Sequence, residues 1–589
     1  MTASEIRRFK HLGFVLCSGF VLSLPVLLFG FPYPAHDSRI HDVWYSSFVA
    51  QFWGGEWYPR WLQNLDGGLG GPTFYFYPPV PYWITSLLQP PFLHLANSWR
   101  ILGVSAALAL LFSGASAYGW LRQFAGKRAA SVAAILYMAM PYHFAIDLQA
   151  RGAFGEIWSF VWMPLILLFA FKASPDNGAA FLGLALAYAL LIMTHLPTVL
   201  MFSIIPLIHV VWTTPAGQRT RRLLWVAAAM GLGVGLSAIF LLPALLEQGS
   251  VRMDFMRTEY FYYENNFFLP HPSLSHLVLT TTDFARQVLK VVVYSAGVGA
   301  CAWLLARRPL RQSGGRETAF WGVVGVGSLL LMFPVSKPVY QAIAPLQLIQ
   351  FPWRFSVVLS VAIAALMALG FDRLRKPYSD SNVVALVAGG ALLLQCFLVA
   401  IQPLRDNSFS PRKNLTGPPD YWKANNFNTT EYRPRWGDID PRKVFAKLRP
   451  DSGELIKARV INGAGAVVTH EWQPRLIVLG LEGGSNMVLE VSQFYYPNWV
   501  ATVDGTTRVA VDPSAPDGLV RLTIPAGSHT VELRFARSKW ESIGGIISLF
   551  CSGILLLLAG MLSWRGWKVR KPRFGDGPAR KSWRESATG

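Results

Sequence analysis

The sequence has little charge and few cysteines, and both shortages narrow the possible classes of protein. Of its 589 residues, 15% are charged and 52% are hydrophobic. A water-soluble chain of this length normally carries more charge and lacks repeated apolar runs of about 20 residues. The four cysteines all lie inside apolar runs and form no CxxC pair, which argues against a zinc site or a redox pair. We therefore predict an integral membrane protein whose polar region contains no disulfide.

A net charge of +20 would suit a nucleic-acid-binding protein, but the basic residues are distributed differently. They cluster in short gaps between apolar runs and in the tail after Ser563. In membrane proteins, lysine and arginine gather in this way in the cytoplasmic loops. We therefore predict no nucleic-acid partner. The basic residues of the tail are Arg565, Lys568, Arg570, Lys571, Arg573, Arg580, Lys581 and Arg584.

The apolar runs predict twelve transmembrane helices, with both termini in the cytoplasm. The first run is long and no small-residue cleavage site follows it, so we expect an uncleaved helix. Segment 79–96 contains four prolines, and counting it as a span would turn every later basic loop outward. We therefore predict an interfacial or re-entrant helix there. The predicted spans are 11–31, 100–121, 129–148, 156–172, 179–195, 197–213, 223–246, 288–306, 318–334, 353–371, 382–401 and 541–563.

The polar region near the C-terminus changes its pattern at about Leu455. Apolar and polar residues there alternate with a period of two, and Gly-Gly and Asp-Gly pairs supply turns. This pattern predicts an extracytoplasmic β-sandwich of about eight short strands. The predicted division is a transmembrane domain with a first outer loop at 32–99, an irregular connector, the sandwich, a last span and a basic cytoplasmic tail, at 1–401, 402–454, 455–540, 541–563 and 564–589.

The loops predicted to face outward hold polar groups that suit one class of reaction. Transfer of a sugar from a polyprenyl phosphate needs a carboxylate to take the proton of the acceptor and cations to neutralise the departing phosphate. It also needs a site at the membrane surface, because the lipid tail of the donor stays in the bilayer. Asp37 is our candidate base, and Asp42 is a second candidate catalytic carboxylate. The candidates for substrate binding are His41, Arg60, Tyr77, Arg151, Glu156, Lys337 and Arg354.

Structural explanations of the same residues stay open. Tryptophan and tyrosine beside spans commonly form an interfacial belt, and arginine at span ends commonly reaches the lipid headgroups. His41 and Asp42 would then simply lie on the polar face of an interfacial helix, 38–54. A divalent metal held by His36, Asp37 and His41 is another alternative, although their spacing matches no strong template. We assign no metal ligand and no certain cofactor.

The first outer loop resembles that of the GT-C superfamily of membrane glycosyltransferases. A basic N-terminus, one span and an outward Asp37 precede an amphipathic helix, and then the motifs GGEWYPRW, GGLGGP and FYFYPPVPYW. In that superfamily an acidic residue just after the first span is catalytic, and a Pro-Pro-aromatic segment precedes the next span. The resemblance therefore implies a catalytic role for Asp37. The chain departs from the paired acidic motif of some relatives, because His36 precedes Asp37 and Asp42 lies five residues further on.

A closer resemblance, covering most of the chain, is to two bacterial membrane families. These are the "6-pyruvoyl-tetrahydropterin synthase-related" family and the YfhO-like proteins, and the latter imply glycosylation of cell-envelope polymers. No His-triad zinc pattern of a soluble pterin synthase is visible in the sequence. The motifs that carry the resemblance are ARGAFGE, THLP, LIQFPWRF, YYPNWVATVDG and IPAGSHTVELRF, at 150–156, 194–197, 348–355, 495–505 and 524–535.

The leading hypothesis is a glycosyltransferase of the bacterial inner membrane. It would transfer a sugar from a polyprenyl-phosphate donor to an envelope glycan or lipid acceptor on the extracytoplasmic face. The alternative is a non-catalytic membrane scaffold or glycan-binding partner in envelope biogenesis. A transporter is the least favoured function, because polar residues deep inside the spans are scarce and transport needs binding groups there.

Overall fold

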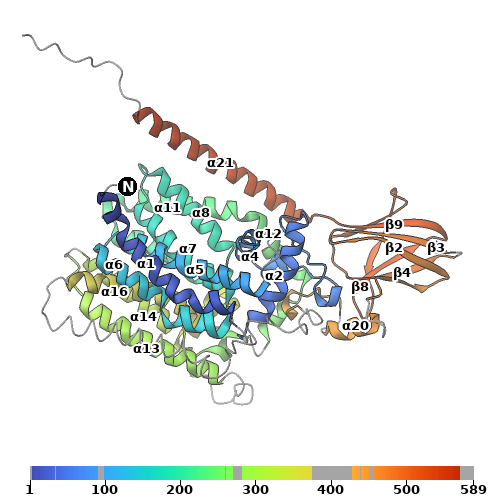
Figure 1. Cartoon of the computed structure of the whole chain (residues 1–589), viewed down its shortest axis with the longest axis horizontal. Coiled ribbons are helices and arrows are strands. Elements are labelled where there is room, and N and C mark those ends of the chain that lie inside the picture. Colours follow the sequence, from blue (N-terminus) through green and yellow to red (C-terminus); the bar gives the residue numbers. More distant parts are fainter. Residues whose placement is uncertain are drawn as a thin grey trace, which may run out of the picture.

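A helical domain and a β-sandwich make up the structure, which is a computed structural model (Figure 1). The helices pack together at one end of the molecule, and the sandwich projects from the other (Figure 1). The predicted fold class, a helical membrane protein with a C-terminal antiparallel β domain, is confirmed. The structure describes residues 3–32, 35–89, 98–258, 261–268, 282–312, 314–374, 428–437, 440–449, 455–483 and 485–570.

The helical domain is built from long apolar helices, as the hydropathy of the sequence predicts. In lipid every backbone polar group must be satisfied within the protein, which a helix achieves by itself. Close helix packing needs small residues: a Cβ on Gly103 would lie 2.5 Å from the carbonyl oxygen of Val26, so the helices α1 and α5 touch backbone to backbone. The main helices are α1 (Ala3–Phe29), α5 (Ser98–Leu121), α6 (Lys127–Met138), the π-helix η2 (Pro141–Arg151), α7 (Phe154–Lys172), α8 (Gly178–Ile192), α9 (Leu196–Phe202), α10 (Ile204–Thr213), α11 (Ala216–Leu236), α12 (Ala238–Leu246), α13 (Thr282–Ala306), α14 (Gly315–Leu330), α16 (Ser356–Arg373) and α21 (Lys539–Arg570).

Within the described residues, eight helices are long and apolar enough to cross a membrane, or up to ten if each of two bent pairs forms one span. The first pair, α11 and α12, is bent by 73°, and the second, α14 with Pro334–Ala342, by 98°. Helix α8 has 15 residues, fewer than a full crossing needs. The predicted span at 382–401 lies outside the described residues.

Short helices fill the predicted first outer loop. They are α2 (Ser38–Trp53), η1 (Asp66–Gly68), α3 (Thr73–Phe76) and α4 (Val80–Leu87). Helix α4 has eight residues, which corresponds to about 12 Å and is too short to cross a bilayer. Helix α4 by itself is therefore no membrane span, while residues 90–96 of the predicted segment 79–96 lie outside the described residues. Helix α2 has the predicted extent, but ten of its residues are buried, His41 and Asp42 included, so these two do not lie on a solvent-facing surface.

The β domain consists of two antiparallel sheets with strand orders β1-β4-β8-β7 and β2-β3-β9-β5-β6. Its nine strands are close to the eight that alternation predicted. In β9 the alternate side chains of Val531, Leu533 and Phe535 are buried, as their period of two requires. The strands are β1 (Ala458–Asn462), β2 (Gly465–Gln473), β3 (Leu476–Gly483), β4 (Met487–Phe494), β5 (Trp499–Val503), β6 (Thr507–Val509), β7 (Val511–Pro513), β8 (Leu519–Ile524) and β9 (Gly527–Phe535).

The sandwich docks on the first outer loop. The Trp61 ring packs against Phe535 with centroids 4.9 Å apart, and its indole N–H donates to the Gln493 side chain at 3.1 Å. The backbone N–H of Phe494 donates to the carbonyl of Leu69 at 2.6 Å. These contacts place the sandwich and the loop that carries Asp37 at the same end of the helical domain.

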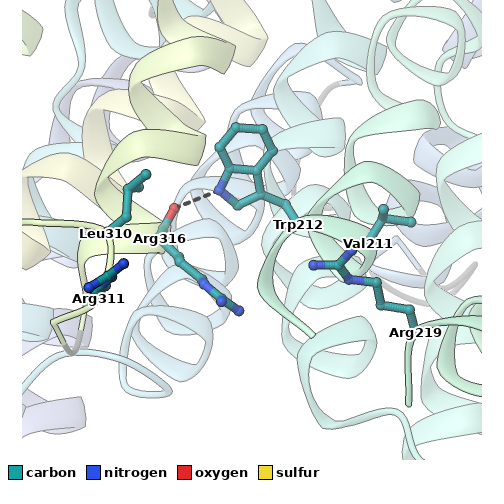
Figure 2. Close-up of a pocket in the computed structure, with 6 residues that line it drawn as sticks. All are labelled: Val211, Trp212, Arg219, Leu310, Arg311 and Arg316. Carbon is teal, nitrogen blue, oxygen red and sulfur yellow. Dashed lines mark hydrogen bonds between the residues drawn. The ribbon is translucent and has the colours of Figure 1, made fainter. Parts of the chain in front are cut away.

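The basic loops lie at the opposite end. Asp372 accepts a hydrogen bond from the backbone of Gly126 at 2.8 Å, and Arg373 donates to the carbonyl of Arg307 at 2.7 Å. The Trp212 indole donates to the carbonyl of Arg316 at 3.1 Å and joins α10 to the start of α14 (Figure 2). The segregation of charge agrees with the predicted topology, while the side of the membrane that each end faces stays a prediction.

Gly152 provides a test of how the fold brings two distant segments together. Its φ of +63° is left-handed, and a Cβ there would lie 2.1 Å from Oγ of Ser38. We expect Gly152→Ala to destabilise the protein by more than ~1 kcal/mol, because the left-handed backbone and the nearby Ser38 hydroxyl both disfavour a Cβ at this position. The midpoint of thermal unfolding in detergent measures this. Gly231→Ala, at a helical position with open space around it, is the matched control and should not lower that midpoint.

Candidate functional site

Two loops distant in the sequence meet at Asp37. The backbone N–H of Asp37 donates to the carbonyl of Arg151 at 2.7 Å, and that of His36 donates to the carbonyl of Ala150 at 3.3 Å. The side chains approach as well, because Oδ2 of Asp37 lies 3.7 Å from Nη2 of Arg151. The segment after the first span and the end of η2 are therefore fixed to each other through both backbone and charge.

Arg151 is the centre of a buried cluster of charges. Its Nη1 donates to Asp147 at 2.6 Å and to Glu156 at 2.7 Å, and its side chain is 5% exposed. The side chains of Asp147 and Glu156 are fully buried. The hydroxyl of Tyr142 donates to the other oxygen of Glu156 at 2.9 Å. Charge-assisted hydrogen bonds of this length hold the guanidinium in one orientation.

Arg354 borders the same cluster from another loop. Its Nε lies 3.8 Å from Oε2 of Glu156, and its Nη1 donates to the carbonyl of Ile349 at 3.0 Å. Within the described part of the chain this Nε has no hydrogen-bond partner. The preceding Gln350 has φ +65° and ψ −49°, a conformation that costs energy for a residue other than glycine. Arg354 therefore has hydrogen-bonding capacity left over, on a loop held in a strained conformation.

Asp37 differs from the other acids of the cluster in its exposure. Its side chain is 41% exposed, whereas those of Asp147 and Glu156 are fully buried. A molecule arriving from solution or from the membrane surface would meet Asp37 first and the buried guanidinium behind it. Such a pair can accept a proton from a hydroxyl group and stabilise a nearby negative charge.

Aromatic side chains form one side of the cluster. Tyr77 packs on Trp44 with ring centroids 4.7 Å apart and on His41 with centroids 5.9 Å apart, and Trp44 also contacts Tyr432. Burial raises the pKa of the Tyr77 hydroxyl, and the charge of Asp37 raises it further. Tyr77 therefore stays neutral and can serve only as a hydrogen-bond donor or acceptor. His41 shares a 2.6 Å hydrogen bond with the Tyr82 hydroxyl.

The described residues offer no obvious metal site. No three histidine, cysteine, aspartate or glutamate side chains among them lie close enough to share an ion. The His36 ring packs against Phe284 with centroids 4.4 Å apart, and His41 is bonded to Tyr82. The two histidines considered as ligands beside Asp37 thus have other partners.

Three predicted site residues lie away from this cluster. Asp42 is buried and accepts a hydrogen bond from Ser98 at 2.5 Å, and burial raises the pKa of its carboxyl. Lys337 is 46% exposed and pairs with Glu264 at 2.7 Å. Arg60 belongs to a separate network. The structure thus brings together Asp37, His41, Tyr77, Arg151, Glu156 and Arg354 from the predicted set, and their catalytic and binding roles stay predictions.

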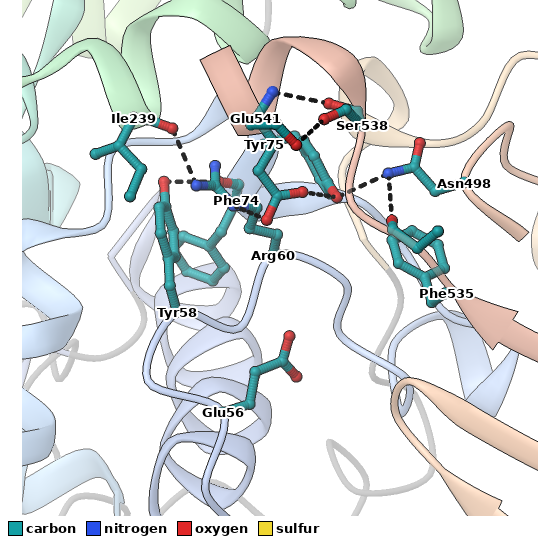
Figure 3. A network of polar contacts seen from close by, with 12 residues as sticks. Glu56, Tyr58, Arg60, Phe74, Tyr75, Ile239, Asn498, Phe535, Ser538 and Glu541 are labelled. Carbon is teal, nitrogen blue, oxygen red and sulfur yellow. Dashed lines mark hydrogen bonds and ion pairs between the residues drawn. The ribbon is translucent and has the colours of Figure 1, made fainter. Parts of the chain in front are cut away.

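Arg60 joins the first outer loop to the last helix and the sandwich (Figure 3). Its Nε lies 3.3 Å from Oε1 of Glu541 in α21, and its Nη2 donates to the carbonyl of Ile239 in α12 at 3.0 Å. Glu541 also accepts from the Tyr75 hydroxyl at 3.0 Å, which in turn accepts from Asn498 at 3.0 Å. The guanidinium is fully enclosed by these partners and by the Tyr58 ring 3.8 Å away. These contacts favour a structural role for Arg60, although its buried Nη1 has no hydrogen-bond partner among the described residues and its predicted role in substrate binding stays a prediction.

Asp147 is the member of the cluster that the sequence analysis missed. It lies inside the predicted span 129–148, where a charged side chain is expensive and usually paired. Its spacing of four residues from Arg151 places both on one side of a helical turn. An acid within an apolar run, followed by Arg151 and Glu156, was the signal that could have identified it.

The buried imidazole of His41 makes a pH-dependent contribution to stability. Burial lowers its pKa from 6.5 to about 4 in the folded protein. Between pH 6.5 and 4 the unfolded chain takes up a proton that the folded chain does not, so acid removes up to about 3 kcal/mol of stability. The wild-type melting temperature should fall when the pH is lowered from 7 to 4.5, and this fall should be smaller in His41→Asn. In His470→Asn, which changes an exposed histidine, the fall should be as large as in the wild type. An unchanged loss in the His41 variant would contradict this assignment.

The Arg60–Glu541 pair predicts a stability effect that a second substitution repairs. Arg60→Met leaves a buried carboxylate without its cation, at a cost of roughly 3–5 kcal/mol. Adding Glu541→Gln should recover much of the lost melting temperature, because the uncompensated charge is gone. Arg442→Met, which breaks an exposed pair with Asp440, is the control and should change little. If Arg60 instead binds the substrate directly, Arg60→Met should melt at the wild-type temperature but lose function. Adding Glu541→Gln should then not restore that function.

Solved structures of membrane glycosyltransferases of GT-C type are similar to this chain at low sequence identity. The arabinofuranosyltransferase AftD from Mycobacteria is 16% identical with a TM-score of 0.43, over 66% of this chain and 27% of that one. The Archaeoglobus fulgidus oligosaccharyltransferase is 14% identical with a TM-score of 0.44, over 73% and 61%. ArnT from Cupriavidus metallidurans is 13% identical with a TM-score of 0.30, over 63% and 78%.

Sequence comparison gives the family. No curated protein matches the chain. Residues 74–402 match a family described as "6-pyruvoyl-tetrahydropterin synthase related domain; membrane protein". This match covers more than half of the 589 residues and includes Tyr77, Arg151, Glu156 and Arg354. The chain therefore belongs to the 6-pyruvoyl-tetrahydropterin synthase-related family of membrane proteins.

Proposed function

We propose that this protein is a membrane glycosyltransferase that takes a sugar from a polyprenyl-phosphate donor. The observation that carries the proposal is the half-exposed Asp37 carboxylate, 3.7 Å from the buried guanidinium of Arg151. Asp37 follows α1, an apolar helix long enough to span the membrane, by eight residues. A carboxylate so close to a span can reach a substrate whose lipid tail remains in the bilayer.

In this proposal Asp37 acts as the general base. An acceptor hydroxyl hydrogen-bonded to Asp37 gives its proton to the carboxylate while its oxygen attacks the anomeric carbon of the donor sugar. The bond from that carbon to the phosphate oxygen breaks, and the polyprenyl phosphate leaves with the bonding electrons. General base catalysis of this kind contributes roughly 10²–10⁴-fold to the rate.

The departing phosphate needs a cation, and Arg354 is better placed to supply one than Arg151. Arg151 already donates to Asp147 and Glu156, and it faces Asp37 as well. Arg354 has a buried Nε without a hydrogen-bond partner among the described residues. We therefore assign Arg151 to positioning Asp37 and Arg354 to the phosphate. The Tyr77 hydroxyl, kept neutral by burial, could donate a hydrogen bond to the sugar or the phosphate.

The acceptor and the location belong to the same proposal. The acceptor is an envelope glycan or lipid, and the reaction takes place on the extracytoplasmic face of a bacterial inner membrane. The support is the charge distribution, because Asp37 and the sandwich lie at the end opposite the basic loops, and basic loops normally face the cytoplasm.

One observation favours a non-catalytic scaffold as the second candidate. The two arginines of the cluster face three carboxylates, so each arginine already has an acidic partner without a substrate, as it would in a purely structural ion-pair network. The sandwich would then bind a glycan or a protein partner. The exposed position of Asp37 favours the enzyme, since a structural network gains little from an acid in contact with water.

Asp37→Asn separates the two candidates. The amide cannot accept the proton, so we expect at least a 100-fold loss of transfer with unchanged protein abundance and melting temperature. The measurement is the glycan composition of the envelope, by mass spectrometry, in a strain that lacks the protein and is complemented with each variant. Asp254→Asn, which alters an exposed acid in the predicted outward loop 247–287, is the control and should complement fully. Full complementation by Asp37→Asn would favour the scaffold.

A further inference from the structure

A pocket at the basic end of the helical domain is separate from the Asp37 cluster. It has a volume of about 380 Å³ and lies between the end of α10, the start of α11 and the loop from α13 to α14. Contact of His36 with Phe284 places the start of α13 beside Asp37, so the far end of this 25-residue helix lies about 35 Å away. The lining residues are Val211, Trp212, Arg219, Leu310, Arg311 and Arg316 (Figure 2).

Half of the lining residues are arginines, and none is acidic. Figure 2 shows the guanidinium groups of Arg219 and Arg316 extending toward each other across the pocket. Like charges so arranged repel unless an anion lies between them. The carboxylate of Glu317 is close in sequence but is already bonded to His209 at 2.9 Å and to the Trp321 indole at 3.2 Å. No acidic side chain of the described pocket lining therefore neutralises these arginines.

The scaffold of the pocket is fixed by local contacts. Nε of Arg219 donates to the carbonyl of Thr214 at 2.9 Å, which leaves its terminal nitrogens available. The Trp212 indole donates to the carbonyl of Arg316 at 3.1 Å and so joins the two sides of the pocket (Figure 2). Arginine presents paired N–H groups that match the oxygens of a phosphate.

The remaining lining residues are apolar and face outward. Leu310 is 59% exposed, and Val211 and Trp212 are each 39% exposed. Val211 and Trp212 belong to the last turn of a helix pair long and apolar enough to span the membrane, Leu196–Thr213. An exposed tryptophan at the end of a span is typical of the lipid–water interface. Positive charge and apolar surface thus lie together at the depth of lipid headgroups.

We propose that this pocket binds the phosphate headgroup of an anionic membrane lipid. The three arginines would hold the phosphate oxygens, while Val211, Trp212 and Leu310 would contact the glycerol and the first carbons of the acyl chains. Basic pockets between membrane helices are suited to such headgroups. The site does not depend on the proposed glycosyl transfer, and a protein inactivated at Asp37 should bind the lipid equally well.

The test measures lipid binding by the purified full-length protein. Native mass spectrometry after titration with phosphatidylglycerol, phosphatidylcholine or inorganic phosphate gives the affinity for each. We expect preferential binding of phosphatidylglycerol, about a fivefold loss on either Arg219→Gln or Arg316→Gln, and a larger loss when both are changed. Arg221→Gln, on the same helix but outside the pocket lining, should bind as the wild type does.

A second variant separates loss of charge from loss of the pocket. Val211→Trp fills the space without changing charge, so it should also weaken lipid binding, with all three arginines present. Equal losses in Arg221→Gln and Arg316→Gln would overturn the proposal, because attraction would then come from the basic surface as a whole. Displacement of the lipid by an equal concentration of inorganic phosphate would overturn the assignment to a lipid.

Discussion

The buried guanidinium of Arg151 is the constraint on which the candidate site depends. A lone charge in a region that excludes water is very costly, and it persists only when carboxylates and hydrogen bonds surround it. Asp147 and Glu156 supply that environment from the two helices on either side of the Gly152 turn. The arginine in turn fixes the loop that carries Asp37. The position of one half-exposed acid therefore follows from the neutralisation of a buried base.

Local sequence was enough to identify most of that cluster. Arg151 and Glu156 lie within one seven-residue motif, and Asp37 and Arg354 each lie beside an apolar run. Charges at such places are unusual enough to attract notice. Arg60 has the same appearance in sequence, yet its partner Glu541 is 481 positions away and becomes visible only when the chain is folded. Sequence reasoning finds unusual charges but does not tell a substrate ligand from the partner of a distant carboxylate.

The fold likewise has features that neighbouring residues predict and features that depend on contacts between distant parts of the chain. Hydropathy located the helices and alternation located the sandwich, because each depends on neighbouring residues. The bend between α11 and α12 was not predicted, and it divides the predicted span 223–246 into two shorter elements, whereas the bend after α14 lies at the predicted end of the span 318–334. The docking of the sandwich on the first outer loop also depends on packing, such as that of Trp61 on Phe535.

The last helix has a mechanical consequence. Just 6% of the residues in the apolar part of α21 are fully buried, while Glu541 at its first turn is anchored to Arg60 and Tyr75. Further along α21, Ser548 accepts a hydrogen bond from the backbone of Ile239 at 2.8 Å, and a Cβ on Gly178 of α8 would lie 2.8 Å from Leu562. The first turn of α21 lies where the helical domain meets the sandwich (Figure 1). A force that tilts α21 would therefore act on the helical domain and on the sandwich together.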